Sequence, residues 1–337
     1  MQQFIVSSFA WTAALSLNVK DDGHRFMRII VKRKIRYIQT VILVCLLTAC
    51  RSDAQDLTAD KRQTEQVSQS AVEKQENSET ADTSARNIIQ AEGNTLESRF
   101  AVPEGYTRLA AQQDSFAEFL RSYPLFPDKE PVHLYDGREK GNQNDHVAVF
   151  DMEMADGDLQ QCADSVLRLY AEYFYRTKQY SRMKFHLTNG FELSFDEWRK
   201  GKRVRVDGND TVWVNSASAS DSEETFFGYL EFLFNYAGTL SMGGECEPQN
   251  LKDVQPGDVF LYSGSPGHVV LILDVCEDSS GNRAFLLGQG YMPAQQFHVL
   301  KNPADEDNPW YYVAEMNYPF ITPEYTFDEG SFMRPVY

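Results

Sequence analysis

Residues 257–289 read GDVFLYSGSPGHVVLILDVCEDSSGNRAFLLGQ, and this stretch decides the fold. It holds three apolar runs, at 258–262, 268–275 and 284–288, separated by segments rich in Gly, Ser, Pro and Asn. Short apolar runs between such turn residues are typical of consecutive strands. The stretch therefore predicts three neighbouring strands of a small antiparallel sheet in an α+β domain.

Two amphipathic segments predict the main helices that pack on this sheet. The first has Asp158 as its cap and an apolar stripe with spacings of three and four residues, which is typical of a buried helix face. The stripe consists of Leu159, Cys162, Val166, Leu169 and Tyr173. The second helix covers 224–237, where Asp221 or Ser222 caps the start and Gly238 ends the helix.

The remainder of 98–337 predicts one globular domain, because it holds nearly all the aromatic residues and shows no repeat or long linker. We expect a helix toward the end of 105–121, strands at 132–135 and 146–154, short strands and turns over 183–214, and a Pro- and aromatic-rich tail that wraps the surface.

Residues 27–49 have the features of a bacterial export signal. Five Lys or Arg residues precede a mostly apolar stretch at 38–49, which suits a signal peptide but is too short to cross a bilayer. The stretch ends in Leu47-Thr48-Ala49-Cys50, which resembles the lipobox of bacterial lipoproteins. The resemblance implies cleavage before Cys50 and acylation of that residue, and two or more acyl chains hold a protein stably on a membrane. An ordinary secretory signal with an incidental cysteine is the alternative.

The segments that flank this signal complete the predicted organisation. A signal normally begins with its basic region. Residues 1–26 are therefore interpreted as an N-terminal extension that results from a wrongly assigned start, or as a segment that is removed together with the signal. Residues 50–97 are interpreted as the lipidated Cys50 and a disordered tether, because 51–95 lack Phe, Trp and Tyr. Arg51 follows Cys50, where an Asp would favour inner-membrane retention, so we expect anchoring in the outer membrane of a Gram-negative-type bacterium.

Charge and motif content exclude several classes of partner and cofactor. The chain has 32 Lys and Arg against 49 Asp and Glu, a formal net charge of −17, whereas nucleic-acid binding needs a basic face. The sequence holds no HExxH, no CxxC and no Gly-rich phosphate loop, so no metal and no cofactor is predicted. Five Cys are too few for a disulfide scaffold, and Cys246 and Cys276 either pair or remain free thiols.

Residues 225–289 resemble the NlpC-type papain-like fold of cell-wall peptidases and amidases. The segments that carry the resemblance are TFFGYLEFLFNYAG at 225–238, QPGDV at 255–259 and GHVVLI at 267–272. In that fold a helix is followed by a Gly-Asp turn into a strand, and the next strand opens with the catalytic His. The resemblance implies a papain-like α+β domain with His268 as base. A His268 that only bonds a nearby carbonyl is the alternative.

The strand register suggests a partner for His268. If Val275 pairs with Ala284 across the turn, Gln289 becomes the diagonal neighbour of His268 on one face of the sheet. A polar side chain there would fix the imidazole tautomer, which is the orienting role in a catalytic triad. A slip of one residue would put Gln289 on the opposite face, where it would be a surface amide.

The resembled families place their catalytic Cys at the start of the helix, but this chain has Phe226 at that position. Cys162 is the candidate from elsewhere, since a helix N-terminus lowers the pKa of a thiol. Gln160 or Gln161 could then donate to an oxyanion, and the order Cys162, His268, Gln289 suits a Cys-His-polar triad. The alternative for Cys162 is core packing, because it lies on the apolar stripe.

Nearly the whole of 98–337 is also similar to a family of envelope lipoproteins known as domain of unknown function 4846. The phrases that carry this similarity are LYDGR at 134–138, LQQCAD at 159–164, GSPGH at 264–268 and YMPAQ at 291–295. The family implies export and a lipobox, but no activity.

Two functional hypotheses follow. The first is a cysteine hydrolase, a peptidase or amidase, that acts on peptidoglycan or peptides. The second is a catalytically inactive domain that binds an envelope peptide, glycan or protein through the same cleft.

Overall fold

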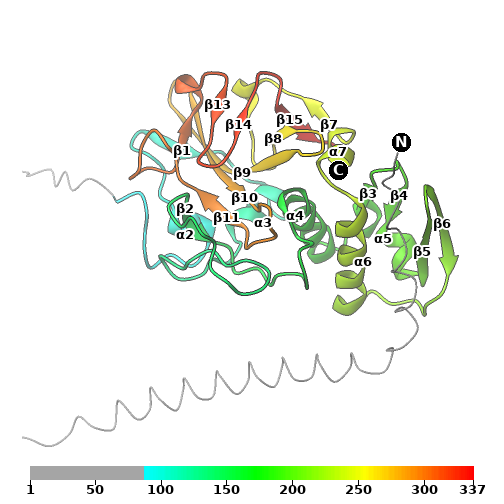
Figure 1. Cartoon of the computed structure of the whole chain (residues 1–337). Helices are drawn as coiled ribbons and strands as arrows, with labels where there is room; N and C mark the ends of the chain where they lie inside the picture. The colour runs from blue at the N-terminus through cyan, green and yellow to red at the C-terminus, as the bar shows by residue number, and fades with distance from the viewer. Residues whose placement is uncertain (1–86) are drawn as a thin grey trace, which may run out of the picture. The chain divides into compact units, whose positions relative to one another are not determined.

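The computed structural model describes residues 87–337 (Figure 1). The predicted extension 1–26, the signal peptide 27–49, the lipidation site Cys50 and most of the tether lie outside the described residues. The folded part extends further toward the N-terminus than the predicted start at residue 98. Ile89 forms a β-bridge with Phe100, and Leu96, in the short helix α2 (Leu96–Arg99), is fully buried.

A nine-stranded antiparallel sheet forms the centre of the domain. Its strands run in the order β2 (His146–Val149), β11 (His298–Leu300), β10 (Arg283–Gln289), β9 (His268–Asp278), β8 (Val259–Tyr262), β15 (Phe332–Pro335) and β7 (Cys246–Pro248), with β1 (Tyr106–Arg108) on β9 and β12 (Tyr311–Tyr312) on β10. The three strands predicted from 257–289 are β8, β9 and β10, at the middle of this sheet. The predicted α+β class is therefore confirmed at this level.

The register between β9 and β10 changes along the pair. Near the turn, Val275 pairs with Phe285 and not, as predicted, with Ala284. A β-bulge then shifts the pairing by one residue, so that Leu271 lies opposite Gly288, as the predicted register requires. The bulge brings Gln289 and His268 to the same face of the sheet.

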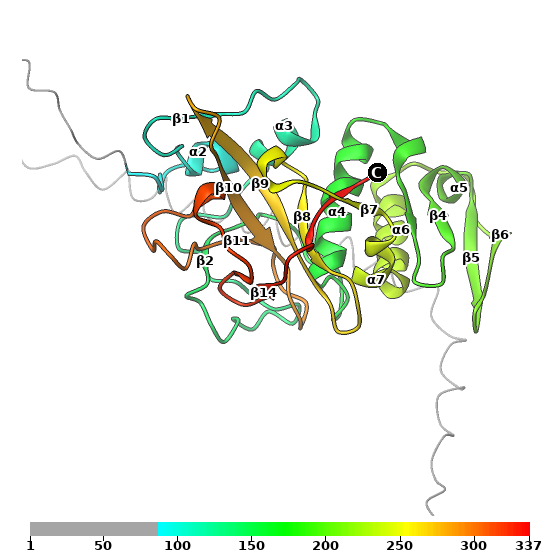
Figure 2. The same ribbon diagram turned by 90° about the horizontal axis from the view of Figure 1, so that it is seen from above.

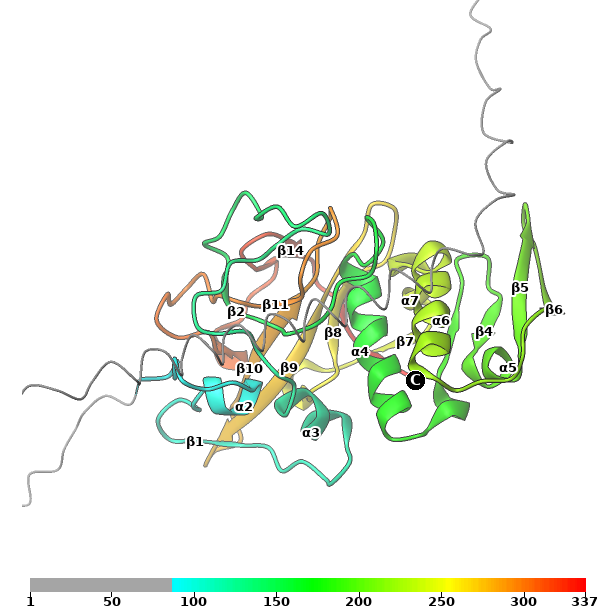
Figure 3. The same ribbon diagram turned by 90° about the horizontal axis from the view of Figure 1, so that it is seen from below.

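One helix, α4 (Cys162–Arg176), lies along a face of the sheet and packs on β9. The second long helix, α6 (Glu223–Tyr236), begins at the predicted cap Ser222 and packs against α4 and α5 (Phe195–Arg199). Figures 2 and 3 show α4 between the sheet and α6. The smaller elements are α3 (Phe116–Arg121), η1 (Tyr180–Arg182), α7 (Thr239–Gly243), η2 (Leu251–Asp253), η3 (Val313–Glu315) and the hairpins β3 (Lys184–His186)–β4 (Glu192–Ser194) and β5 (Lys202–Asp207)–β6 (Asp210–Asn215).

The two faces of the sheet are buried in two separate layers, because side chains alternate along a strand. Val269, Leu271 and Leu273 of β9 pack in the layer that holds α4. Val270 and Ile272 pack on the opposite side, against the hairpin β13 (Phe320–Ile321)–β14 (Thr326–Phe327) near the C-terminus. The tail was predicted to wrap the surface, but β13 and β14 cover a buried face and β15 inserts between β8 and β7.

One further prediction differs from the structure, and one is confirmed. The segment 132–135 forms no strand and contributes only isolated bridges, such as Leu134 with Gln295. The helix expected toward the end of 105–121 is α3. Among residues 87–337, no helix is long and apolar enough to cross a membrane.

Candidate functional site

His268 and Gln289 form a direct side-chain contact at the end of the sheet. The ring Nε2 of His268 lies 2.8 Å from the Oε1 of Gln289. Both side chains are buried, with 2% and 0% exposure. Burial lowers the pKa of His268 to about 4, although the hydrogen bond to Gln289 opposes this shift. The imidazole is therefore neutral at physiological pH.

Three aromatic rings enclose the imidazole of His268. The ring centroids of Tyr291 and Tyr325 each lie 4.7 Å from it, and that of Phe327 lies 6.0 Å from it. Tyr325 and Phe327 come from the β13–β14 hairpin. This hairpin therefore closes the site on the face of the sheet that lies away from α4.

Cys162 is the first residue of α4, and its N-cap is Gln161. The predicted cap, Asp158, instead accepts a hydrogen bond from the backbone N–H of Ala294, at 2.6 Å. The Cys162 thiol is 6% exposed and lies within reach of the backbone N–H of Val269, the residue after His268. The thiol thus lies where β9 begins, on the face of the sheet that carries Val269, whereas the His268 ring lies on the other face, beside Phe327.

Burial sets the charge of this thiol. Burial first, and the charge of Asp164 second, raise the pKa of Cys162 to about 11, although nearby backbone N–H groups oppose the shift. The N–H groups at the start of α4 do lower this pKa, as predicted, but burial outweighs them, so the predicted thiolate is not favoured. Cys162 is a neutral thiol, and within residues 87–337 no hydrogen bond joins it to His268 or Gln289.

Asp164 is a second buried polar group in the first turn of α4. Its Oδ2 accepts a hydrogen bond from the N–H of Gln161 at 3.0 Å, whereas its Oδ1 has no partner among the described residues. Burial raises the pKa of Asp164 to about 7. A carboxyl that changes charge near neutral pH therefore lies two residues from the thiol.

A cavity of about 320 Å³ opens beside Cys162. Its walls come from the start of α4, the junction between α6 and α7 at 237–240, the loop 264–267 that precedes His268, and Met292. The first N–H groups of a helix have no acceptor within the helix. The N–H of Cys162 is such a group, and it lies close to the thiol of the same residue.

The helix that the resemblance aligned with the catalytic helix does not lie on the sheet. Phe226, at the expected nucleophile position in α6, is buried and stacks on Tyr175 of α4 with ring centroids 4.3 Å apart. The helix on the sheet is α4, and its first residue is a cysteine. The helix that carried the papain-like resemblance therefore packs outside α4, and Phe226 is a core residue of that helix.

Neither glutamine before Cys162 is free to donate to an oxyanion. Gln160 is fully buried, accepts a hydrogen bond from Arg168 at 2.5 Å and donates to the sulfur of Met152 at 3.3 Å. The side-chain amide of Gln161 donates to Asp158 at 3.2 Å. This prediction is therefore wrong for both residues.

The polar contacts continue beyond Gln289 to residues that the sequence did not single out. The amide Nε2 of Gln289 donates to Oε2 of Glu324 at 2.7 Å, and the ammonium of Lys140 donates to the same oxygen at 2.6 Å. His298 lies beside them, fully buried on β11. These residues are far apart in the chain, and no local motif connects them.

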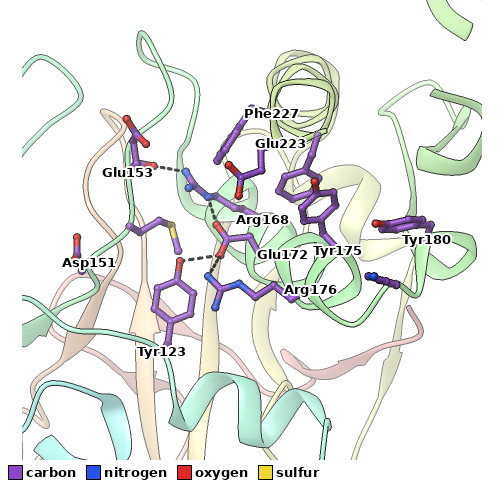
Figure 4. Close-up of a pocket in the computed structure, with 13 residues that line it drawn as sticks. Tyr123, Asp151, Glu153, Arg168, Glu172, Tyr175, Arg176, Tyr180, Glu223 and Phe227 are labelled. Atoms are coloured by element: carbon purple, nitrogen blue, oxygen red, sulfur yellow. Dashed lines mark hydrogen bonds and ion pairs between the residues drawn. The ribbon is translucent and has the colours of Figure 1, made fainter. Parts of the chain in front are cut away.

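A second cavity, of about 440 Å³, lies elsewhere along α4 and is shown in Figure 4. At its floor, Glu172 accepts hydrogen bonds from Arg168 at 2.8 Å, Tyr123 at 3.0 Å and Arg176 at 3.2 Å. Both oxygens of Glu172 are thus engaged within the protein. The network satisfies buried charges and ties α4 to neighbouring segments, so this cavity is the weaker candidate.

The remaining candidate groups form no further centre. Cys246 and Cys276 are free thiols, and Cys276 is fully buried in the sheet. Of the two alternatives that the sequence left open, the structure therefore has the free thiols and not the disulfide. No group of three His, Cys, Asp or Glu side chains in the described part of the chain is placed to hold a metal ion.

Comparison with known families gives one match, to the family described as Domain of unknown function (4846), over residues 96–334. The chain belongs to this family. Its model begins at Leu96, which is buried in α2, and ends within β15. No curated protein and no solved structure matches the chain.

Proposed function

We propose that this domain is a cysteine hydrolase that cleaves an amide bond, with Cys162 as nucleophile, His268 as general base and Gln289 as the residue that orients His268. The observation that carries the proposal is the 2.8 Å contact between His268 and Gln289 at the sheet end where α4 begins with Cys162. The chain order Cys, His, polar residue is that of a Cys-His-polar triad.

The proposed reaction starts from neutral groups. His268 takes the proton of the Cys162 thiol as the sulfur attacks the carbonyl carbon of the substrate, which forms a C–S bond and a tetrahedral oxyanion. The N–H at the start of α4 donates to this oxyanion. His268 returns the proton to the leaving amine, and water then hydrolyses the thioester. Burial of both groups places the proton transfer after substrate binding, because the free protein holds them uncharged.

The substrate class we propose is a peptide amide of the cell envelope. This part rests on the resemblance of the strand segments 255–259 and 267–272 to NlpC-type peptidases and amidases and on the cavity beside Cys162. The acidic chain, with its net charge of −17, is repelled by anionic lipid surfaces, so a lipid on Cys50 would supply the anchoring. The same proposal places the domain at the outer membrane.

A direct test of the reaction incubates the protein with peptides released from purified peptidoglycan and identifies cleaved amides by mass spectrometry. We expect Cys162→Ala and His268→Ala to lower the rate by at least about 10³-fold, because each removes a group that takes part in bond cleavage. Cys246→Ala, which removes a thiol that does not line the cavity, is the matched control. Thermal unfolding of each variant separates lost chemistry from lost folding. Full activity in folded Cys162→Ala would rule out the proposed nucleophile.

The anchor is tested separately in cells. We expect a radiolabelled fatty acid to label the wild-type protein and not Cys50→Ser, because Cys50 is the only proposed acceptor. Equal labelling of the two proteins would contradict the lipoprotein proposal without bearing on catalysis.

Binding without catalysis is the second candidate function. It is favoured by the burial of Cys162 and His268 in their uncharged forms. In this case peptidoglycan peptides would bind to the wild type and to Cys162→Ala with equal affinity, and neither protein would cleave them.

A further inference from the structure

The orientation of the Gln289 side-chain amide is determined by its neighbours. Its Nε2 lies 2.7 Å from Oε2 of Glu324, and its Oε1 lies 2.8 Å from Nε2 of His268. A carboxylate only accepts hydrogen bonds, so the group of Gln289 that faces Glu324 must be the donating NH₂. The accepting oxygen of Gln289 is then directed to His268.

The charge of Glu324 is fixed by its own surroundings. Burial favours the neutral acid, but contacts with His298 and Lys140 outweigh this effect and lower the pKa of Glu324 to about 2. Lys140 is itself buried and donates to Oε2 of Glu324 at 2.6 Å. Glu324 is therefore an ionised, acceptor-only group throughout the physiological pH range.

His298 is compatible with this orientation in either protonation state. Its Nδ1 lies 2.9 Å from the carbonyl oxygen of Gln296, so Nδ1 carries a proton. In the neutral ring Nε2 accepts, and the Nε2 of Gln289 is 3.5 Å away. A protonated His298 would form an ion pair with Glu324, whose Oε2 lies 3.8 Å from its Nε2. In both states the amide oxygen of Gln289 faces His268.

We propose that Glu324 is a positioning residue that acts through Gln289 to fix the neutral tautomer of His268, with the proton on Nε2 and the lone pair on Nδ1. Because Gln289 presents an oxygen to Nε2, only the protonated Nε2 makes a hydrogen bond there. The inference rests on the proposed function for its catalytic consequence, since a lone pair on Nδ1 is what a base for the Cys162 proton needs. The tautomer itself does not depend on that function.

The β13–β14 hairpin is thereby given a role in the site besides covering it. Glu324 lies in the turn between its two strands, and Tyr325, the next residue, packs on the His268 ring. One short segment near the C-terminus therefore both encloses the imidazole and supplies the charge that orients its partner.

The test is ¹⁵N nuclear magnetic resonance of the histidine rings in the wild type and in Glu324 variants. The chain has 6 His, and comparison with His268→Gln assigns the signals of His268. In the wild type near pH 7 we expect Nε2 to be protonated and Nδ1 not. In Glu324→Ala the Gln289 amide is free to turn, so we expect a substantial Nδ1-protonated population. Glu324→Gln retains an oxygen acceptor for Gln289 and should restore the wild-type signals.

A matched control and a kinetic measurement complete the experiment. Glu329→Ala removes an exposed carboxylate from the turn that follows β14 and should leave the spectrum unchanged. If the protein is a hydrolase, Glu324→Ala should lower kcat by about 10- to 10³-fold with little change in KM, and Glu324→Gln should restore kcat. An Nδ1-protonated His268 in the wild type, or an unchanged tautomer in folded Glu324→Ala, would overturn the proposal. A wild type that has the expected tautomer but cleaves nothing would overturn only the proposed function.

Discussion

At the scale of single residues, the first residue of α4 is subject to two opposing electrostatic effects. The helix N-terminus favours a thiolate, with a contribution of at most about 1–2 kcal/mol. Burial opposes it and raises the pKa of Cys162 to about 11. At pH 7 only about one molecule in 10⁴ then carries a thiolate. Reaction at Cys162 therefore requires a base that takes its proton, the role proposed for His268, or a change in burial when substrate binds.

Asp164 gives a prediction on stability that depends on pH. Its pKa is raised by burial to about 7, whereas an unfolded Asp titrates near 3.9. Between these values the unfolded chain has already lost the proton that the folded state keeps. The free energy of unfolding should therefore fall as pH rises from about 4 to 7, by an amount bounded at roughly 4 kcal/mol.

We expect Asp164→Asn to be more stable than the wild type at pH 8, by about 1–3 kcal/mol, and equal to it near pH 4. The Asn keeps an oxygen that can accept the hydrogen bond from Gln161, so the helix cap is retained. Urea unfolding across this pH range measures the difference, and Asp156→Asn, an exposed residue before the helix, is the control. Equal stability of Asp164→Asn and wild type at pH 8 would contradict the prediction that the buried Asp164 carboxylate destabilises the folded state.

At the scale of secondary-structure elements, the sequence predicted the strands better than it predicted which helix lies on them. Runs of apolar residues identify β8, β9 and β10 directly, because strands buried on both faces contain few polar positions. No pattern in the sequence predicts the bulge between Leu286 and Leu287. The register extrapolated from the turn began with a wrong pair, Val275 with Ala284. It still placed Gln289 on the correct face of the sheet, because the bulge shifts the pairing by one residue.

The helices α4 and α6 are both amphipathic and of similar length, so periodicity alone could not assign one of them to the sheet. The segment that precedes the His strand in the chain is α6, and local order therefore favoured it. The structure instead places α4 on β9 and packs α6 outside it, on α4 and α5. Tertiary packing decides this point, and for the same reason Phe226 could not be recognised as a core residue from its position in the chain.

The parts of the site that come from distant elements were also outside the reach of sequence reasoning. Gln289 and His268 are joined by one hairpin, so a count along two strands could connect them. Glu324 reaches Gln289 only because the β13–β14 hairpin folds back over the sheet. Lys140 comes from a loop before β2. Such long-range contacts follow from the assembled core and have no local pattern.

At the scale of the whole molecule, segments from both ends of the domain are fastened to its central sheet. Asp274 of β9 is fully buried and receives hydrogen bonds at 2.7 Å from Arg108 of β1 and from Arg121 of α3. At the other end, Arg334 of β15 binds the buried Asp258 at 2.6 Å. Buried carboxylates paired in this way are costly to separate from their partners. The sheet that carries His268 and Gln289 is thus held from both termini.

The N-terminal boundary gives the last prediction, because the fold begins before residue 98. A chain of residues 98–337 lacks Leu96, which is fully buried, and Gly93, whose carbonyl accepts a hydrogen bond from the buried Arg99 at 2.8 Å. Loss of a buried Leu costs about 1.5–3 kcal/mol, and loss of a hydrogen bond to a charged group costs about as much again. We therefore expect 98–337 to unfold with a free energy about 3–5 kcal/mol lower than that of 87–337, as measured in urea.

The control is Leu96→Ala in the longer chain, which should account for part of this loss because it removes the apolar contact but keeps the Gly93 carbonyl. Equal stability of the two chains would mean that residues 87–97 contribute nothing to the core. A large loss would instead mean that any lipid tether on Cys50 must end by about residue 87, some ten residues closer to the anchor than the composition of the segment suggests.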